Sequence, residues 1–165
     1  MSDRPTVWLS ERDRRALSTF ALQWAPRETG GILLGYWRAD ERDLVITEVI
    51  GPGEGARHGD ASFEPDGAYH IEVVERAYRD SGRAIVYVGD WHSHPAGSTA
   101  LSDRDVRTLI AIARDRRARI RRPVMGVVGG SDAEDFALWM AEPPWFPWLR
   151  RWRAQPLAVT VHRHR

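Results

Sequence analysis

Residues 91–95 read WHSHP, and together with Ser102 and Asp105 they decide the fold and chemistry that we expect of the chain. Side chains alternate between the two faces of a β-strand, so His92 and His94 project from one face if the apolar run before them is a strand. Ser102 and Asp105 have the spacing of a helix N-cap and a first-turn carboxylate. Two imidazoles and one carboxylate suit a metal such as zinc and leave a fourth position open, which is typical of catalytic sites.

A catalytic metal site of this kind also needs a general base, because a nearby carboxylate can take the proton of a water that attacks a carbonyl. Glu28 is the best candidate, since it lies in the run RETGG (residues 27–31) just before a predicted strand. The two glycines of this run permit a close approach of the backbone to its neighbours or to a ligand. Most other acidic residues lie at helix starts or in charge-rich surface segments.

The composition excludes several classes of protein. The formal net charge of the 165 residues is +1, which gives no general attraction to nucleic acid, and no segment approaches the roughly 20 apolar residues of a membrane span. Residues 1–5 lack the apolar core of a signal peptide, so we expect a cytoplasmic protein. The absence of cysteine excludes a thiol nucleophile, disulfides and Cys-based zinc sites, including those of the zinc nucleobase deaminases.

The pattern along the chain is mixed α/β. Ser10 has the chemistry of an N-cap for a helix that ends at Pro26, with Glu11 and Asp13 in its first turn. Residues 51–59 contain four glycines and are expected to form a mobile loop. The other predicted elements are strands at Gly31–Trp37, Leu44–Ile50, Arg83–Trp91, Val124–Val128, Phe136–Met140 and Leu157–Val161, and helices at Pro65–Arg79 (Tyr69, Val73 and Ala77 inward) and Ser102–Arg119.

The chain contains no internal repeat and no linker, so residues 1–165 are expected to form a single domain. Residues 143–165 form a C-terminal extension rich in aromatic residues, arginine and proline. Its aromatic run could dock a partner, but we favour packing over the sheet. The run comprises Trp145, Phe146, Trp148, Leu149 and Trp152.

Taken together, the candidate residues resemble the JAMM motif of the JAB/MPN metallopeptidases. That motif is a glutamate, a gap, and then H-x-H-x(7)-S-x-x-D, which Glu28, His92, His94, Ser102 and Asp105 match without an insertion. The order of the predicted elements is also similar over about residues 8–141. The resemblance implies a three-layer α/β/α deaminase-like fold with a mixed sheet.

The resemblance also implies a role for each residue of the motif. His92, His94 and Asp105 would hold one zinc ion per chain, Glu28 would be the general acid and base, and Ser102 would help to stabilise the oxyanion. Members of the family cleave isopeptide or peptide bonds after the C-terminal glycine of ubiquitin-like proteins, by attack of zinc-bound water. The same expectation therefore applies to this chain.

The compact chain resembles stand-alone bacterial JAB proteins, which are often encoded beside ubiquitin-activating-like and conjugating-like enzymes, including in anti-phage operons. We therefore expect a zinc isopeptidase that acts on a ubiquitin-like protein or its conjugate, with those enzymes as possible partners and with no nucleic-acid or membrane partner. A peptidase that processes a small sulfur-carrier protein is an alternative. A module that binds a ubiquitin-like tail without cutting it is another.

Some residues also have simpler interpretations. Ser102 and Asp105 fit a capping box without any catalytic meaning, and Asp90 could orient one of the histidines. The histidines at 58, 70, 162 and 164 are interpreted as surface or core residues. The basic cluster of Arg114, Arg116, Arg117, Arg119, Arg121 and Arg122 could attract nucleic acid, but we favour a solvated helix end.

Overall fold

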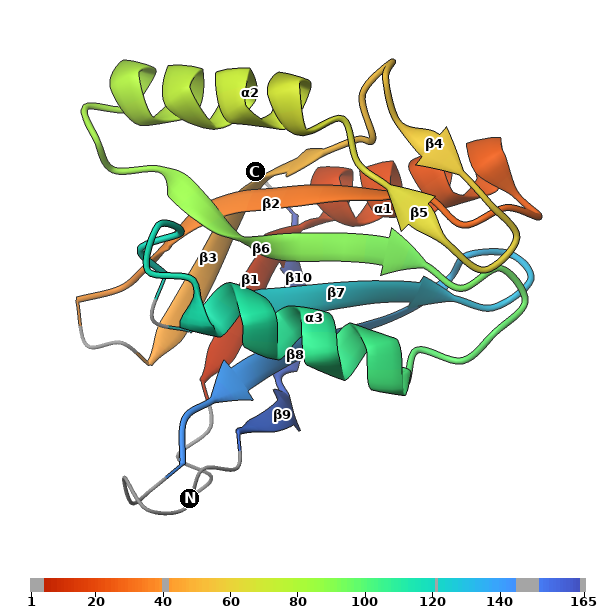
Figure 1. Ribbon diagram of the computed structural model, residues 1–165. Coiled ribbons are helices and arrows are strands. Elements are labelled where there is room, and N and C mark those ends of the chain that lie inside the picture. The colour runs from red at the N-terminus through yellow and green to blue at the C-terminus, as the bar shows by residue number, and fades with distance from the viewer. Residues whose placement is uncertain (1–4, 40–41, 121, 145–151, 164–165) are drawn as a thin grey trace.

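A computed structural model describes residues 5–39, 42–120, 122–144 and 152–163 (Figure 1). Its centre is one mixed sheet of eight strands in the order β10-β1-β3-β2-β6-β7-β8-β9. The strands of this sheet are β1 (Thr6–Ser10), β2 (Gly30–Trp37), β3 (Asp43–Ile50), β6 (Val86–Ser93), β7 (Val124–Gly129), β8 (Asp135–Glu142), β9 (Arg153–Pro156) and β10 (Ala158–His162). Two further short strands, β4 (Arg57–His58) and β5 (Phe63–Glu64), form a separate hairpin.

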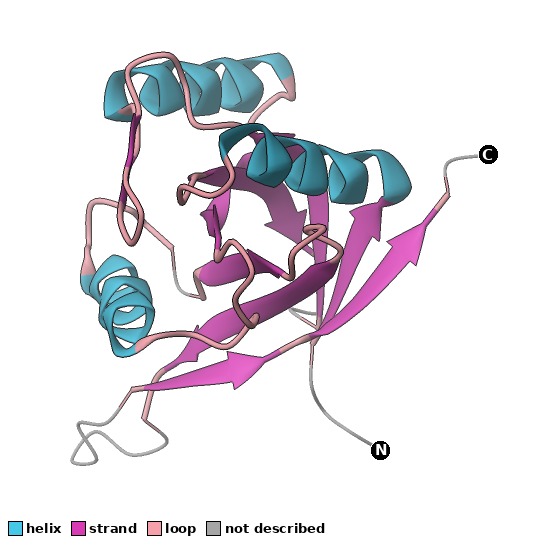
Figure 2. Cartoon of the chain, turned by 90° about the vertical axis from the view of Figure 1, so that its right-hand side faces the viewer, coloured by secondary structure: helices cyan, strands magenta, loops and turns pink. Residues whose placement is uncertain are grey.

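Helices cover both faces of the sheet. Helix α1 (Glu11–Trp24) lies on one face, and α2 (Gly67–Asp80) and α3 (Asp103–Arg114) lie on the other (Figures 1 and 2). This arrangement confirms the three-layer α/β/α fold with a mixed sheet that was predicted from the sequence. Among the described residues, no helix has the length and apolar character needed to cross a membrane.

The alternation of side chains along β2 divides the core between the two faces of the sheet. Leu33 packs with Leu17 and Ala21 of α1, whereas its neighbours Ile32 and Leu34 pack with Val73 of α2. Leu17, Leu33 and Leu34 are fully buried. Burying such a side chain stabilises the fold by about 1.5–3 kcal/mol, so both helix layers are held mainly by apolar packing.

The predicted start of α1 is confirmed. Ser10 is its N-cap, and the Ser10 side chain accepts a hydrogen bond of 3.0 Å from the backbone N–H of Asp13. The α3 helix also begins as predicted, but it ends at Arg114 rather than Arg119. The carboxylate of Asp115 accepts a hydrogen bond of 2.9 Å from the Arg117 N–H and so closes a turn that competes with the helix.

Helix α2 faces the sheet as predicted at Val73, which is buried, and at Ala77, which packs against the same cluster, but not at Tyr69. Tyr69, which was expected to point inward, is 38% exposed, whereas its neighbour His70 is buried. The His70 ring is held by its Nε2–H, which donates to the carbonyl oxygen of Gly51 at 2.8 Å. A buried polar group is stable only with such a partner, so this hydrogen bond supports the inward position of His70.

The segment predicted as a loop at residues 51–59 contains strand β4, which pairs with β5. A side chain from the start of α2 also holds this segment. Asp66, the N-cap of α2, accepts hydrogen bonds from the backbone N–H groups of Gly55 (2.9 Å) and Tyr69 (3.1 Å). The prediction of an irregular loop was therefore incomplete.

Strands β9 and β10 bridge the two ends of the sheet, although only the second was expected. They are separated by Leu157 alone, and Figure 2 shows them following each other in one line. β9 pairs with β8 at one end of the strand order, and β10 pairs in parallel with β1 at the other. The Leu157 N–H donates to the Leu138 carbonyl at 2.9 Å, which fixes the crossing point.

Only part of the predicted aromatic run can be assessed. Trp145, Phe146, Trp148 and Leu149 lie outside the described residues, as does Arg121 of the arginine cluster. Trp152 is partly buried and packs against the cluster of Leu109, Met125 and Ala141 between α3 and the sheet. At Trp152, the preference for packing over the sheet is confirmed.

Candidate metal centre and active site

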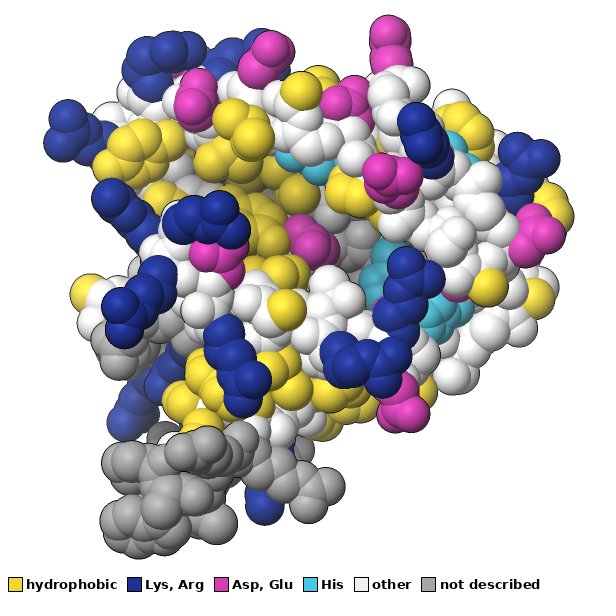
Figure 3. All heavy atoms as spheres, in the orientation of Figure 1, with side chains coloured by type: hydrophobic (Ala, Val, Ile, Leu, Met, Phe, Trp, Pro, Cys, Tyr) yellow, Lys and Arg dark blue, Asp and Glu magenta, His cyan; other side chains and the backbone are white. Residues whose placement is uncertain are grey.

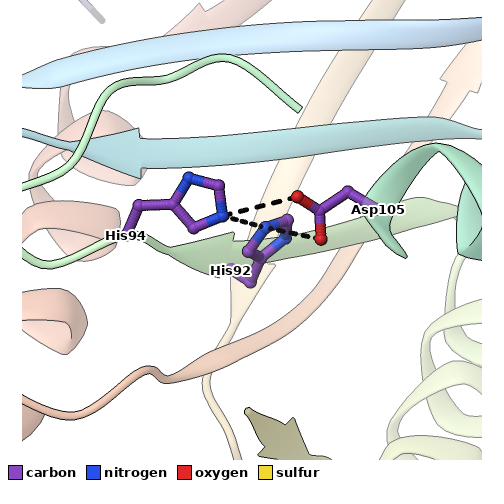
Figure 4. A group of neighbouring side chains, drawn as sticks. All are labelled: His92, His94 and Asp105. Carbon is purple, nitrogen blue, oxygen red and sulfur yellow. Dashed lines mark hydrogen bonds and ion pairs between the residues drawn. The ribbon is translucent and has the colours of Figure 1, made fainter. Parts of the chain in front are cut away.

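The two histidines of the WHSHP run lie side by side at the end of β6. The strand extends to Ser93, two residues further than predicted, and the His94 N–H still donates to the Val128 carbonyl of β7 at 2.8 Å. The Nε2 atoms of His92 and His94 are 3.0 Å apart (Figure 4). The prediction that both side chains project from one face is therefore confirmed.

Asp105, in the first turn of α3, points at this pair. Its Oδ1 is 3.3 Å from Nε2 of His92 and its Oδ2 is 3.4 Å from Nε2 of His94 (Figure 4). The same carboxylate completes a capping box, because Oδ2 accepts hydrogen bonds of 2.7 Å from both the N–H and the hydroxyl of Ser102. The capping box, considered above as an alternative, thus coexists with the cluster and orients its carboxylate.

The electrostatics of the cluster favour a carboxylate anion. Burial alone would raise the pKa of Asp105, but hydrogen bonds from His92, His94 and Ser102 outweigh it and hold that pKa far below its usual range. The pKa of His94 is raised, chiefly by its hydrogen bond to Asp105, with burial opposing this effect. Both shifts follow from the close approach of the Asp105 carboxylate to the two imidazoles.

The donor set fits a divalent metal ion. One ligand atom from each of His92, His94 and Asp105 lies within 4.8 Å of the other two. Nδ1 of His94 is 3.0 Å from the Ser98 carbonyl, which can only accept, so Nδ1 carries a proton. A metal ion that displaced the Nε2 proton shared with Asp105 would therefore find the Nε2 lone pair facing the other two groups. Two imidazoles and a carboxylate in one cluster are the ligands expected for zinc.

Glu28 is brought to the same place by the pairing of β2 with β6. The Thr29 N–H donates to Oγ of Ser93 at 3.0 Å, and the Ser93 N–H donates to the Thr29 carbonyl at 2.7 Å. Gly30 pairs with His92, and a Cβ at Gly30 would lie 2.4 Å from the Trp91 carbonyl oxygen. The close backbone approach expected of this glycine is therefore confirmed.

His58, for which the sequence predicted only a surface or core position, holds the backbone of Glu28. Its Nδ1 is 3.1 Å from the Glu28 carbonyl oxygen, and its ring stacks on Trp24 with centroids 3.5 Å apart and planes 9° apart. The Glu28 N–H donates to the Gly59 carbonyl at 2.9 Å. The β4–β5 hairpin therefore positions Glu28, a role for which neither the spacing nor the composition gave a signal.

The predicted site residues line one cleft between α2 and α3 with a volume of about 420 Å³ (Figure 3). These are Glu28, His92, His94, Ser102 and Asp105, and the cleft also contains His70 and Asp90. The sequence suggested that Asp90 could orient one of the histidines, but its hydrogen bond goes to another residue. Its Oδ1 instead accepts a hydrogen bond of 2.7 Å from the Tyr87 hydroxyl, and burial raises the pKa of Asp90 despite this bond.

Comparisons with known proteins agree with this geometry. Residues 10–142 match the family model described as prokaryotic homologs of the JAB domain. A probable metalloprotease, y4qB, of Sinorhizobium fredii is 39% identical over 127 residues, which cover 75% of this chain and 76% of that protein. A CD-NTase/cGAS isopeptidase of Enterobacter hormaechei is 29% identical over 133 residues, covering 81% of this chain and 72% of that protein.

A second protein named CD-NTase/cGAS isopeptidase, from Escherichia coli, is 31% identical over 108 residues, covering 66% of this chain and 68% of that protein. Among solved structures, the solution structure of protein DSY2949 from Desulfitobacterium hafniense superposes with a TM-score of 0.68 at 18% identity. The superposition covers 96% of this chain and 94% of that one. At this identity, the likeness shows a common fold alone.

Proposed function

The chain belongs to the family of prokaryotic homologs of the JAB domain, and from this premise we propose that it is a zinc-dependent isopeptidase acting on a conjugate of a ubiquitin-like protein. That it is a metallopeptidase follows from the family and from relatives named metalloprotease and isopeptidase. The finer proposal is that it cleaves after the C-terminal glycine of the ubiquitin-like protein. The observation that carries the proposed metal-dependent hydrolysis is the meeting of Glu28 with the cluster of His92, His94 and Asp105 in one cleft.

In this proposal His92, His94 and Asp105 hold one zinc ion per chain. When bound there, zinc would supply Lewis-acid chemistry, polarising the scissile carbonyl and making a water molecule more acidic. The hydrogen bond from His94 Nδ1 to the Ser98 carbonyl and the capping box around Asp105 hold these side chains in place before the metal arrives. Preorganised ligands of this kind lower the cost of binding the ion.

Glu28 is the proposed proton carrier. Its side chain lines the cleft, and its backbone is held from both sides by His58 and Gly59. A carboxylate so placed can accept a proton from the attacking water and pass it to the leaving amine. Ser102 is proposed to donate its hydroxyl to the oxyanion, which requires the hydroxyl to turn away from its present acceptor, Oδ2 of Asp105.

The names of the relatives support the proposed substrate class. Two of them, from Enterobacter hormaechei and Escherichia coli, are named CD-NTase/cGAS isopeptidase. We therefore propose an isopeptide bond between a ubiquitin-like tail and an enzyme of the CD-NTase/cGAS class as the first substrate to test. Activating and conjugating enzymes of a bacterial conjugation pathway, including one used against phage, are the corresponding proposed partners.

The test combines metal analysis with a cleavage assay. Wild-type protein, His92→Ala and Glu28→Gln are purified with zinc present, and a CD-NTase joined through an isopeptide bond to a ubiquitin-like protein is the substrate. Glu48→Gln is a matched control, because Glu48 is an exposed glutamate of β3 that does not line the cleft. We expect about one zinc per chain in wild type, Glu28→Gln and Glu48→Gln, and loss of zinc in His92→Ala.

Cleavage is expected in wild type and Glu48→Gln alone. Cleavage by Glu28→Gln at the wild-type rate would contradict the role of Glu28 as proton carrier. Zinc without cleavage of the conjugate would refute the proposed substrate and favour a small sulfur-carrier protein, which can be assayed with the same preparations. A wild type that takes up no zinc would refute the assigned ligands and favour a module that only binds its partner.

A further inference from the structure

We propose that Asp90 and the hollow beside it form a subsite for a basic side chain, arginine or lysine, of the substrate segment next to the scissile bond. This inference rests on the proposed function, because it assigns the subsite to the same cleft. It concerns residues that the JAMM-like pattern does not include.

Asp90 lies on the same face of β6 as the proposed metal ligands. It precedes His92 by two residues on the strand and pairs with Ile32 of β2. Two residues of a strand span about 6.6 Å, which is also the reach of about two residues of an extended substrate. An extended substrate that runs along β6 with its scissile bond at the histidines would bring a side chain about two positions away to Asp90.

The carboxylate of Asp90 has one hydrogen bond but no ion-pair partner among the described residues to offset its burial. Its hydrogen bond comes from the neutral Tyr87 hydroxyl, and among the described residues no arginine or histidine lies within salt-bridge distance of it. The ring of His70, its neighbour in the cleft, donates instead to the Gly51 carbonyl. Placing a carboxylate without an ion-pair partner in a partly apolar hollow costs free energy, and a cation carried by the substrate would offset part of that cost.

The walls next to Asp90 suit the stem of a long basic side chain. A second hollow of about 390 Å³ shares Ile32, His70 and Asp90 with the lining of the metal cleft, and its sides also include Val74 and Tyr87. Figure 3 shows hydrophobic side chains around acidic ones in the hollow between α2 and α3. Arginine and lysine bury their methylene stems against such surfaces while the charged head reaches an anion.

Two charged groups at the mouth of this hollow bear on the proposal. Glu75 of α2 lines the hollow and adds a second negative charge. Arg117 also lines it, but its guanidinium interacts with Asp115, with Nε 3.3 Å from Oδ1. The mouth therefore admits a cation without displacing an existing partner of Asp90.

The experiment compares a cation with its neutral isostere. Zinc-loaded full-length protein is titrated with N-acetyl-arginine methylamide and with the citrulline equivalent, which has the same shape without the charge. Binding is followed by NMR at the backbone amides of residues 87–91 and at the Trp91 indole. Asp90→Asn tests the subsite, and Glu72→Gln is the matched control, because Glu72 is exposed on α2 and does not line either hollow.

We expect wild type and Glu72→Gln to bind the arginine compound at least about ten-fold more tightly than the citrulline compound, as for one charge-assisted hydrogen bond. In Asp90→Asn the ratio should fall to about one while the zinc content stays unchanged. Equal binding of the two compounds by wild type, or an unchanged ratio in Asp90→Asn, would overturn the proposal. Because the readout is binding, the result is independent of whether the CD-NTase conjugate is cleaved.

Discussion

The hydrogen bond between Thr29 and Ser93 provides a sharp test of how the two halves of the candidate site are joined. Both residues are buried, and the Thr29 N–H has Oγ of Ser93 as its acceptor at 3.0 Å. Ser93→Ala removes that acceptor but leaves the reciprocal backbone bond from the Ser93 N–H to the Thr29 carbonyl. The variant therefore leaves the buried Thr29 N–H without its acceptor and changes no other hydrogen bond of this pair.

The expected loss of stability follows from this single orphaned donor. A buried N–H without a partner costs about 1–3 kcal/mol, and in a chain of this size each kcal/mol corresponds to about 2–4 °C in melting temperature. Thr29→Val is the matched variant, because Oγ1 of Thr29 is buried without a hydrogen-bond partner. Removing that hydroxyl should cost nothing and could add roughly 1 kcal/mol.

Urea denaturation of the metal-free proteins measures both changes under one condition. The free energy of unfolding should fall in Ser93→Ala and stay equal or rise in Thr29→Val. Surface substitutions usually change the free energy of unfolding by no more than about 0.5 kcal/mol. If the free energy of unfolding of Ser93→Ala lay within that range of the wild-type value, the hydrogen bond would not contribute as argued. A Thr29→Val variant as unstable as Ser93→Ala would show instead that the Thr29 hydroxyl has a partner.

Three further predictions concern the hairpin, the metal and acid stability. His58→Ala removes the ring that holds the Glu28 carbonyl, so we expect kcat for the conjugate to fall while zinc content, measured by mass spectrometry, stays at the wild-type level. Zinc at 100 times its Kd should raise the free energy of unfolding of wild type by about 2.7 kcal/mol, and the same addition should leave the thermal melt of His92→Ala unchanged. Hydrogen bonds from the Tyr69 and Gly55 N–H groups lower the pKa of Asp66. The contribution of Asp66 to the free energy of unfolding is therefore present above the unfolded pKa of about 3.9, and it is lost as the pH falls through the lower folded pKa. Asp66→Asn should flatten this part of the acid-denaturation curve.

The parts of the site that the sequence predicted are those set by local geometry. The alternation of side chains along a strand brought His92 and His94 together, and the Ser-x-x-Asp spacing of a capping box placed Asp105 in the first turn of α3. Glu28 is far from them in sequence. It was selected from its glycine-rich context and from the resemblance to the JAMM motif, and the pairing of β2 with β6 accounts for its place in the cleft.

The features that were missed depend on contacts between distant segments. The role of His58 requires a hairpin to fold over the strand that follows Glu28. The inward position of His70 depends on a carbonyl oxygen 19 residues earlier. Strands β1 and β9 are short, and each is stabilised by a neighbour that no local pattern identifies. Local propensity is too weak to predict such elements without their partners.

The bridge formed by β9 and β10 has a consequence for synthesis on the ribosome. Strand β1 is translated before the other described strands, yet β10, one of its two parallel neighbours, is translated after them. At about 5–20 residues per second, the outer edge of β1 waits for roughly eight to thirty seconds without that neighbour. The elements that carry Glu28, His92, His94 and Asp105 are all translated within this interval. The nascent chain therefore has its metal-binding elements before its sheet is bridged, and during that time an exposed strand edge is open to pairing with other chains.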